Sequence, residues 1–247
     1  MISFSRISKP GSRPVNEDCV AGIKKDNKYL FILCDGLGGH GSGDVASGTA
    51  AESFSQEFEK YSGDIIGFFK EAYIRAQENI GMRQQTDDSM SAMKTTVVAL
   101  IIDGEVAGWS HIGDSRLYYF AQGNLVSRTA DHSVPQMLYK SGEIEESEIR
   151  FHPDRNKLLR ALGDTAGNPQ YTVSDVLVLE DDSAFLLCSD GFWEYITEDT
   201  MVKSLIESAD ADEWLRKMSE EVEKNNCGKK SDNYSAVAVM IKGGTAL

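Results

Sequence analysis

The chain has little cysteine and no long apolar stretch. Its four cysteines among 247 residues lie far apart and at irregular spacings, which fits neither a disulfide framework nor a zinc site. No apolar run approaches the roughly 18 residues that a membrane helix needs. The N-terminal residues lack the basic-then-apolar pattern of a secretion signal. We therefore expect a cytoplasmic protein with reduced thiols and no membrane partner.

Positive charge is also scarce. Lys and Arg number 25 against 39 Asp and Glu, a formal net charge of −14. The densest basic segment, KNNCGKK at 224–230, is too short to form a nucleic-acid-binding face. An anionic body also repels anionic ligands unless a local cation reverses the field. Repeats and low-complexity linkers are absent as well, so we expect a single domain over residues 1–247.

Apolar periodicity predicts the elements. The expected strands are 19–25, 28–35, 95–103, 105–113, 115–127, 171–179, 184–190 and 234–242. The expected helices are 45–61, 64–84, 133–142, 197–207 and 210–224, with Asp64 as an N-cap. Short turns at Asp103–Gly104, Gly113–Asp114 and Gln122–Gly123–Asn124 connect the β runs between residues 95 and 127, which we therefore expect to be antiparallel neighbours. Helix pairs between blocks of antiparallel strands predict an α+β fold with helices outside the sheets.

A glycine-rich turn follows the second strand. Gly36, Gly38 and Gly41 spell GxGxxG, the fingerprint of dinucleotide-binding proteins. The parallel βαβ context of that fingerprint is missing, and no Lys-Ser/Thr completes a P-loop. A plain turn does not explain Asp35, which ends an apolar strand where an ionised carboxylate is costly unless it is paired or metal-bound.

Acidic residues recur at such strand ends. They are Glu17, Asp18, Asp35, Asp114, Asp190 and Asp232. Any one of them alone is most simply a cap or a turn residue. If the sheets bring the strand ends together, however, the like charges need a neutralising cation. Oxygen ligands without a His or Cys cluster favour Mg²⁺ or Mn²⁺.

Two such ions sharing a carboxylate would have a chemical use. They would fix a water and lower its pKa, which supplies a nucleophile for in-line displacement at phosphorus. Arg13, four residues before Glu17, could grip a phosphate with two hydrogen bonds, although a surface arginine is the plainer interpretation.

Eight motifs resemble, in order, those of the metal-dependent type 2C protein phosphatases in their compact bacterial form. They are RPVNED (13–18), CDGLGGHGSGDVAS (34–47), KTTVVALI (94–101), HIGDSRLYYF (111–120), TADHSVPQ (129–136), RNKLLRALG (155–163), CSDGFWEYI (188–196) and SDNYSAVAV (231–239). The resemblance implies a four-layer α-β-β-α sandwich of two antiparallel sheets between helix pairs. It also implies a protein serine/threonine phosphatase with a binuclear Mn²⁺ or Mg²⁺ site at one end of the sandwich.

The resemblance implies the ligands of the two ions. Asp35 would bridge both ions, and the Gly36 carbonyl would bind one of them. Asp190 and Asp232 would bind the other. Arg13 would hold the phosphate, so the expected catalytic set comprises this arginine and the three aspartates.

Further residues have implied supporting roles. The Glu17–Asp18 pair would contribute to the site directly or through water. Asp114 resembles the residue that, with Asp190, holds a third and weaker ion in bacterial members. Residues 140–156, within a flap subdomain at about 133–160, would lie beside the site and bear on substrate choice.

The general acid is left open by the sequence. Leu37 stands where many eukaryotic relatives have a histidine proposed for that role. His40, in the GGHG turn, and a metal-bound water are the two alternatives, while turn stabilisation is the plainer role for His40. Thr95 and Thr96 are expected to begin a core strand. Asp131-His132-Ser133 cannot act as a hydrolase triad, because adjacent residues cannot stack in that way.

Other phosphatase chemistries do not fit. No cysteine begins a C-x₅-R loop, and the nearest match to DxDx[TV], DADEW at 210–214, lies in a helical region with Trp in the last place. The alternative function is a non-catalytic phosphoprotein-binding or metal-binding regulatory module of the same fold, whose mark would be loss of metal ligands. The expected partners are phosphoproteins. At the family level these include a Ser/Thr kinase, a secretion-system component and proteins of sigma-factor control.

Overall fold

A computed structural model describes residues 1–38, 42–86, 88–164 and 167–243. The helices are α1 Gly43–Phe58, α2 Ile65–Thr86, α3 Val134–Ser141, α4 Asp190–Trp193, α5 Glu198–Ile206 and α6 Ala211–Asn226, with 3₁₀ helices η1 Asp88–Met90 and η2 Glu146–Phe151. The strands are β1 Ile2–Lys9, β2 Asp18–Lys25, β3 Lys28–Leu37, β4 Lys94–Thr95, β5 Val97–Asp103, β6 Val106–Ile112, β7 Arg116–Ala121, β8 Asn124–Arg128, β9 Thr172–Val173, β10 Leu177–Val178, β11 Ser183–Cys188 and β12 Tyr234–Ile241.

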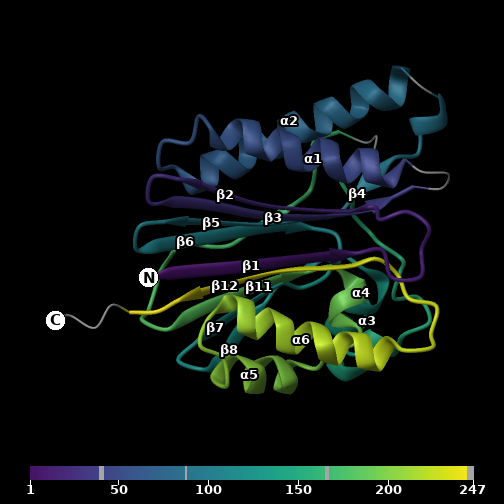
Figure 1. The fold of residues 1–247 in the computed structure, drawn as a ribbon. Helices are drawn as coiled ribbons and strands as arrows, with labels where there is room; N and C mark the ends of the chain where they lie inside the picture. Colours follow the sequence, from purple (N-terminus) through teal and green to yellow (C-terminus); the bar gives the residue numbers. More distant parts are fainter. Residues whose placement is uncertain (39–41, 87, 165–166, 244–247) are drawn as a thin grey trace.

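Two sheets stack between two pairs of helices (Figure 1). One sheet, here called the β12 sheet, has the order β1-β12-β11-β7-β8. The other, the β3 sheet, has the order β10-β6-β5-β3-β2, with β4 and β9 paired to β3 and β6. Helices α1 and α2 cover the β3 sheet, and α5 and α6 cover the β12 sheet. All recorded strand pairs are antiparallel, so the predicted α-β-β-α sandwich is confirmed.

Strand alternation along β3 divides its side chains between two apolar layers. Ile32 and Cys34 pack in the layer under α1 and α2. Phe31 and Leu33 pack in the layer between the sheets. Because successive residues of a strand point to opposite faces, Asp35 continues the inner row. Its carboxylate therefore lies at the rim of the layer between the sheets.

The helices form where the sequence predicts them, and two of them show why. The side chain of Asp64 accepts a hydrogen bond from the Gly67 N–H at 2.9 Å, which caps the start of α2 as expected. Residues four apart in α6, Trp214, Met218 and Val222, are all buried in the layer against the β12 sheet. This spacing gives α6 one apolar face.

The predicted antiparallel pairing across Gly113–Asp114 is wrong. Strand β6 belongs to the β3 sheet and β7 to the β12 sheet, so the chain crosses from one sheet to the other at this turn. Gly113 has φ +100°, and an added Cβ would lie 2.5 Å from a Thr96 methyl carbon. The short turn thus changes sheets and places Asp114 between them.

Other elements differ from the expected ones. Strand β1, which pairs with β12 along eight residues, was not predicted. The expected strand at 171–179 consists of two separate two-residue strands, β9 and β10. The flap contains the 3₁₀ helix η2, and Asp190 begins α4 rather than ending β11. Among the described residues, no helix is both long enough and apolar enough to cross a bilayer.

Candidate active site

A cleft of about 280 Å³ opens at one end of the sandwich. It lies at the end where α4 and β4 are labelled in Figure 1. Its lining residues are Arg13, Glu17, Asp35, Gly36, Leu37, Gly38, Asp114, Asn156, Leu158, Asp190, Asp232 and Asn233. Every site residue expected from the sequence is among them except Asp18, which is buried behind Asp35.

The β2–β3 hairpin brings two carboxyl groups face to face. Asp18 lies directly opposite Asp35 in the register. The preceding pair is hydrogen-bonded, since the Gly36 N–H donates to the Glu17 carbonyl at 3.1 Å. Asp18 and Asp35 therefore form a non-hydrogen-bonded pair, the kind whose side chains approach most closely. Burial first, and then the Asp18 charge, raise the pKa of Asp35 well above its usual range.

Threonines fix the backbone of Asp35. Its N–H donates to Thr96 Oγ1 at 3.0 Å, and its carbonyl accepts from the Thr96 N–H and from Thr95 Oγ1, both at 2.9 Å. Thr96 Oγ1 also lies 2.7 Å from Ser115 Oγ. The TTVV motif thus does more than begin a strand, because it holds the carboxylate-bearing residue from behind.

Gly36 stands where no side chain fits. A Cβ there would lie 2.1 Å from the Gly43 carbonyl oxygen and 2.7 Å from the Glu17 carbonyl oxygen. The glycine lets the start of α1 pack against the end of β3. Gly36 therefore serves the close packing around the aspartate that precedes it.

The next two aspartates come from the β12 sheet side. Asp190 begins α4, and Asp114 lies in the crossing between the sheets. The indole Nε1–H of Trp193 donates to the Asp114 carbonyl at 3.0 Å. Burial and then the Asp131 charge raise the pKa of Asp114 to about 7. Burial and then the Asp114 charge raise the pKa of Asp190 well above its usual range.

The N-terminal loop is tied to the start of β12. Arg13 Nη2 donates to Asp232 Oδ2 at 2.7 Å. Asn233 Oδ1 accepts from the Glu17 N–H at 2.8 Å, while Asn233 Nδ2 donates to the carbonyls of Pro10 and Val15 at 2.9 and 3.0 Å. This asparagine therefore positions both Arg13 and Glu17. The only sequence signal for it is a polar residue at the start of a buried strand.

Asp18 carries an unsatisfied oxygen. Its Oδ2 accepts from Ser189 Oγ at 2.9 Å. Its Oδ1 is buried and has no hydrogen-bond partner among the described residues. Burial is the first cause that raises the pKa of Asp18, which lies at about 6. A buried carboxylate oxygen without a donor is the signature of a place for a cation or a water.

The donor set fits hard divalent cations. Every polar side chain that the cleft offers as a ligand is a carboxylate or an amide, and such oxygens suit Mg²⁺ and Mn²⁺. Within the described ranges, no three His, Cys, Asp or Glu side chains converge closely enough to enclose an ion by themselves. The carboxylates instead surround a cleft with room for water, and Mg²⁺ usually keeps several waters.

Two side chains of the flap, which the sequence did not single out, reach the cleft. Asn156 and Leu158 line it, within the flap expected at about 133–160. Neither is charged, so strand-end acidity could not reveal them. Leu37 lines the cleft as well, whereas His40 lies outside the described residues.

Asp131 and His132 of the DHS motif have separate partners. Asp131 binds the Arg116 guanidinium at 2.8 and 2.7 Å. His132 Nδ1 accepts from the Gly113 N–H at 3.2 Å. Ser133 precedes the first turn of α3. These contacts agree with the expectation that the motif is no catalytic triad.

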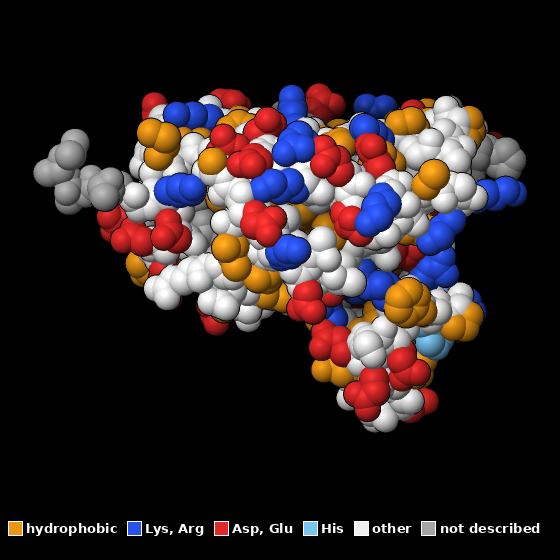
Figure 2. All heavy atoms as spheres, turned by 60° about the horizontal axis from the view of Figure 1, so that its bottom comes forward, with side chains coloured by type: hydrophobic (Ala, Val, Ile, Leu, Met, Phe, Trp, Pro, Cys, Tyr) orange, Lys and Arg blue, Asp and Glu red, His pale blue; other side chains and the backbone are white. Residues whose placement is uncertain are grey.

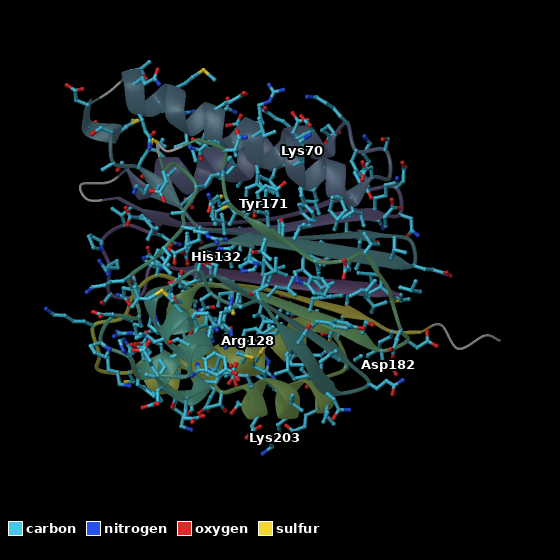
Figure 3. The ribbon with its side chains drawn as sticks, turned by 180° about the vertical axis from the view of Figure 1, so that it is seen from behind. Lys70, Arg128, His132, Tyr171, Asp182 and Lys203 are labelled. Carbon is cyan, nitrogen blue, oxygen red and sulfur yellow. The ribbon has the colours of Figure 1, made fainter. Side chains whose placement is uncertain are left out.

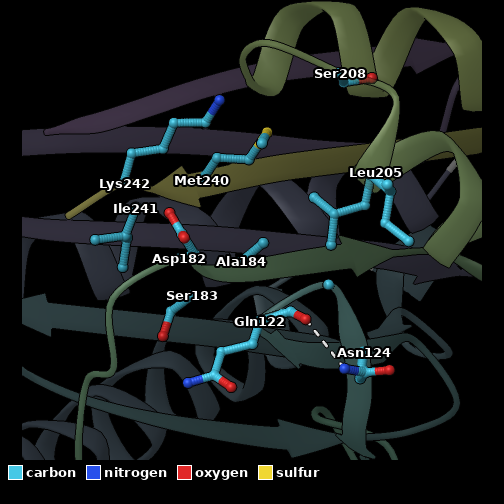
Figure 4. A pocket seen from close by; sticks show the side chains of 12 residues that line it. Gln122, Asn124, Asp182, Ser183, Ala184, Leu205, Ser208, Met240, Ile241 and Lys242 are labelled. Atoms are coloured by element: carbon cyan, nitrogen blue, oxygen red, sulfur yellow. Dashed lines mark hydrogen bonds between the residues drawn. The ribbon is translucent and has the colours of Figure 1, made fainter.

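A larger cavity, of about 650 Å³, lies at the opposite end of β11 and β12 (Figure 4). Its lining includes Gln122, Asp182, Met240 and Lys242. None of the carboxylates that surround the cleft contributes to it. It is therefore separate from the candidate active site.

Residues 11–233 match the family model described as Protein phosphatase 2C. The chain belongs to the protein phosphatase 2C family. It is 31% identical over 195 residues to the serine/threonine protein phosphatase PstP of Mycobacterium tuberculosis, an alignment covering 78% of this chain and 36% of that protein. It is 32% identical over 197 residues to the serine/threonine phosphatase stp of Listeria welshimeri, covering 75% and 77%.

Solved structures of the same family share the whole fold. The M. tuberculosis PstP structure superposes with a TM-score of 0.87 at 26% identity, covering 98% of this chain and 99% of that one. A second structure of the PstP catalytic domain, in complex with two manganese ions, gives a TM-score of 0.84 at 25% identity, covering 98% and 99%. The segment shared with full-length PstP is thus only about a third of that protein's length, 36%.

Proposed function

We propose that this chain is a Mn²⁺- or Mg²⁺-dependent protein serine/threonine phosphatase that hydrolyses phosphoserine and phosphothreonine in proteins. The observation that carries the proposal is the single cleft shared by five carboxylates and Arg13. Membership of the protein phosphatase 2C family and the two manganese ions in a relative support it.

The proposed ligands follow from the cleft. Asp35 would help to hold both ions, together with the Gly36 carbonyl on one and with Asp190 and Asp232 on the other. Asp114 faces the same space and would serve a third, weaker ion. When bound, the cations would activate a water for attack on phosphorus and offset the phosphate charge.

The chain's own residues do the remaining work. Arg13, whose side chain is 57% exposed, can turn its guanidinium from Asp232 to a phosphate oxygen pair. Leu37 and Leu158 give the cleft apolar walls. Because Leu37 has no proton to donate, the leaving alkoxide must take its proton from another group or from solvent.

The setting of the enzyme is proposed as well. We infer one catalytic domain over residues 1–247, in the cytoplasm, and its free thiols at all four cysteines are compatible with that compartment. Phosphoproteins are the substrates, and a cognate Ser/Thr kinase is one expected partner. The flap at about 133–160 would bear on the choice among them.

Phosphate release from a phosphothreonine peptide tests the proposal. Turnover should require Mn²⁺ or Mg²⁺, stop on addition of a chelator, and be lost in Asp190→Ala. The matched control is Asp199→Ala, which removes an exposed carboxylate on α5. Mn²⁺ binding without any turnover would instead support the non-catalytic binding module.

A further inference from the structure

The outer edge of β8 is open. The β12 sheet ends at β8, and no described strand pairs with its far side. The opposite edge strand, β1, packs against the β3 sheet, because the rings of Phe4 and Phe31 lie 5.1 Å apart. On β8, by contrast, Val126 is 56% exposed. An open edge with an exposed apolar residue can accept an added strand.

A groove of about 560 Å³ runs along this edge. Its lining includes all of Leu125–Arg128, four consecutive residues of β8. β8 bulges at Val126, where its register with β7 shifts, so the regular alternation of side chains is interrupted and all four residues can line one groove. Ser147 and Ile149, from η2 in the flap, form the other wall. Figure 3 shows Arg128 in the half of the molecule that holds α5.

The groove exposes negative charge and hides positive charge. Arg128 donates to Glu146 at 2.6 Å, with side chains 14% and 55% exposed. Arg150 donates to both oxygens of Glu198 at 3.0 Å, with side chains 13% and 34% exposed. In each pair the guanidinium lies deeper than the carboxylate. A ligand entering the groove therefore meets carboxylates first.

The flap adds to this negative surface. Figure 2 shows a lobe that projects from the body and carries several carboxylates. Four exposed glutamates come from the flap: Glu143, Glu145, Glu146 and Glu148. The whole chain has a formal charge of −14, which further favours a cationic ligand.

We propose that the edge of β8 binds an extended basic segment of the phosphoprotein substrate as an added strand. The segment's backbone pairs with β8, its Lys or Arg side chains meet Glu146 and Glu198, and an apolar side chain covers Val126. This docking site is distinct from the cleft and rests on the proposed function for the identity of its ligand.

Binding of short unphosphorylated peptides tests the site. The probe is fluorescein-labelled KVKVKV, measured by anisotropy at physiological salt. Matched peptides separate charge attraction from backbone pairing. EVEVEV reverses the charge, and KPKPKP keeps the charge but cannot form a strand. KVKVKV that is N-methylated at alternate residues, either the lysines or the valines, loses one row of backbone N–H donors. KVKVKV should bind at least about tenfold more tightly than EVEVEV, which loses the charge pairs with the groove. It should also bind at least about tenfold more tightly than KPKPKP and than one of the two methylated peptides, which lose backbone hydrogen bonds to β8.

Substitutions at Val126 locate the peptide. Val126→Lys places a cation on the open edge and should weaken KVKVKV binding about tenfold. Val126→Thr keeps the branched side chain without charge and should bind within about twofold of the wild type. Hydrogen exchange of the β8 amides should slow when the peptide is bound. Turnover of p-nitrophenyl phosphate, which cannot reach the groove and the cleft together, should stay unchanged in both variants.

Two results would overturn strand addition at β8. Equal binding of KVKVKV and KPKPKP would mean charge attraction alone and overturn strand addition. Competition by inorganic phosphate with Mn²⁺ present would place the peptide in the cleft and also overturn the proposal. Since these peptides carry no phosphate, the test stands even if the protein proves inactive. For an active protein, fusing KVKVKV through a Gly-Ser linker to a phosphothreonine peptide should lower KM and leave kcat unchanged.

Discussion

Two groups of buried charge lie side by side in this protein, and they are balanced differently. Arg116 and Asp131 are 3% and 2% exposed and form a two-bond pair at 2.8 and 2.7 Å. The Trp193 ring also lies 3.4 Å from the Arg116 guanidinium. The carboxylates around the cleft have Arg13 as their one recorded ion-pair partner in the described chain. The paired group is neutralised within the protein, whereas the unpaired group needs a cation from outside.

The largest expected effect is on activity, through the unpaired group. Asp35→Asn should lower turnover of a phosphothreonine peptide by at least roughly a thousandfold, about 4 kcal/mol, since the cation-dependent activation of water is lost. Steady-state kinetics with Mn²⁺ measure this loss. Residual activity within tenfold of the wild type would show that Asp35 does not serve the ions.

A large loss of stability is expected when the paired group is broken. Arg116→Met leaves Asp131 buried without its cation and should lower the free energy of unfolding by about 3–5 kcal/mol. Urea unfolding measures the change. Arg116→Met with Asp131→Leu should recover most of the loss.

An exposed pair provides the control for this effect. Arg216 and Glu220 have side chains 56% and 63% exposed. Arg216→Met should change the free energy of unfolding by no more than about 0.5 kcal/mol. A similar small effect for Arg116→Met would contradict the distinction between the two groups.

The pH dependence of stability should also distinguish the unpaired carboxylates of the cleft from the Arg116–Asp131 pair. The folded pKa of Asp114 is raised to about 7 from an ordinary 3.8. Between about pH 4 and pH 7 the folded protein therefore keeps a proton on Asp114 that the unfolded chain releases. The free energy of unfolding of the wild type falls as the pH rises through this range. In chelator, the free energy of unfolding of Asp114→Asn should rise relative to that of the wild type across this window, by roughly 4 kcal/mol, and then level off.

Urea unfolding at several pH values in chelator measures this difference. His111 and His132, whose pKa values are lowered chiefly by burial, are present in both proteins, so their contributions cancel from the difference. A difference between the two proteins that stays constant from pH 4 to pH 8 would contradict the account. Asp131→Asn, whose native carboxylate is already paired, provides the comparison.

A smaller effect on activity is expected at Arg13, at the exposed rim of the cleft. Arg13→Lys keeps the charge but loses the fork that can hold two phosphate oxygens, and kcat/KM should fall about tenfold. The free energy of unfolding should stay within about 0.5 kcal/mol, because the pair with Asp232 is largely exposed. Full activity of the lysine variant would argue against a two-bond grip.

The helices and the central strands could be predicted because their periodicity is local. The crossing at Gly113–Asp114 could not, because the same two-residue turn suits a hairpin or a change of sheet, and only packing against Thr96 decides. Strand β1 depends on its partner β12, more than 200 residues away along the chain, with Ile2 opposite Ile241. Such a distant pairing has no local signal.

The acids of the site could be predicted because strand ends converge in a two-sheet sandwich. The residues that position these acids could not be predicted in the same way. Asn233, Thr96 and Ser189 act through hydrogen bonds to chain segments that are remote in sequence. Asn156 and Leu158 reach the cleft because the flap folds over it, which no charge pattern indicates.

Anomalous X-ray diffraction from crystals grown with Mn²⁺ tests most directly whether the unpaired carboxylates jointly hold the cations. Two strong manganese peaks should lie in the cleft, both within about 2.2 Å of an oxygen of Asp35, a usual length for such metal–oxygen contacts. Peaks elsewhere on the protein, or none within reach of Asp35, would contradict the account.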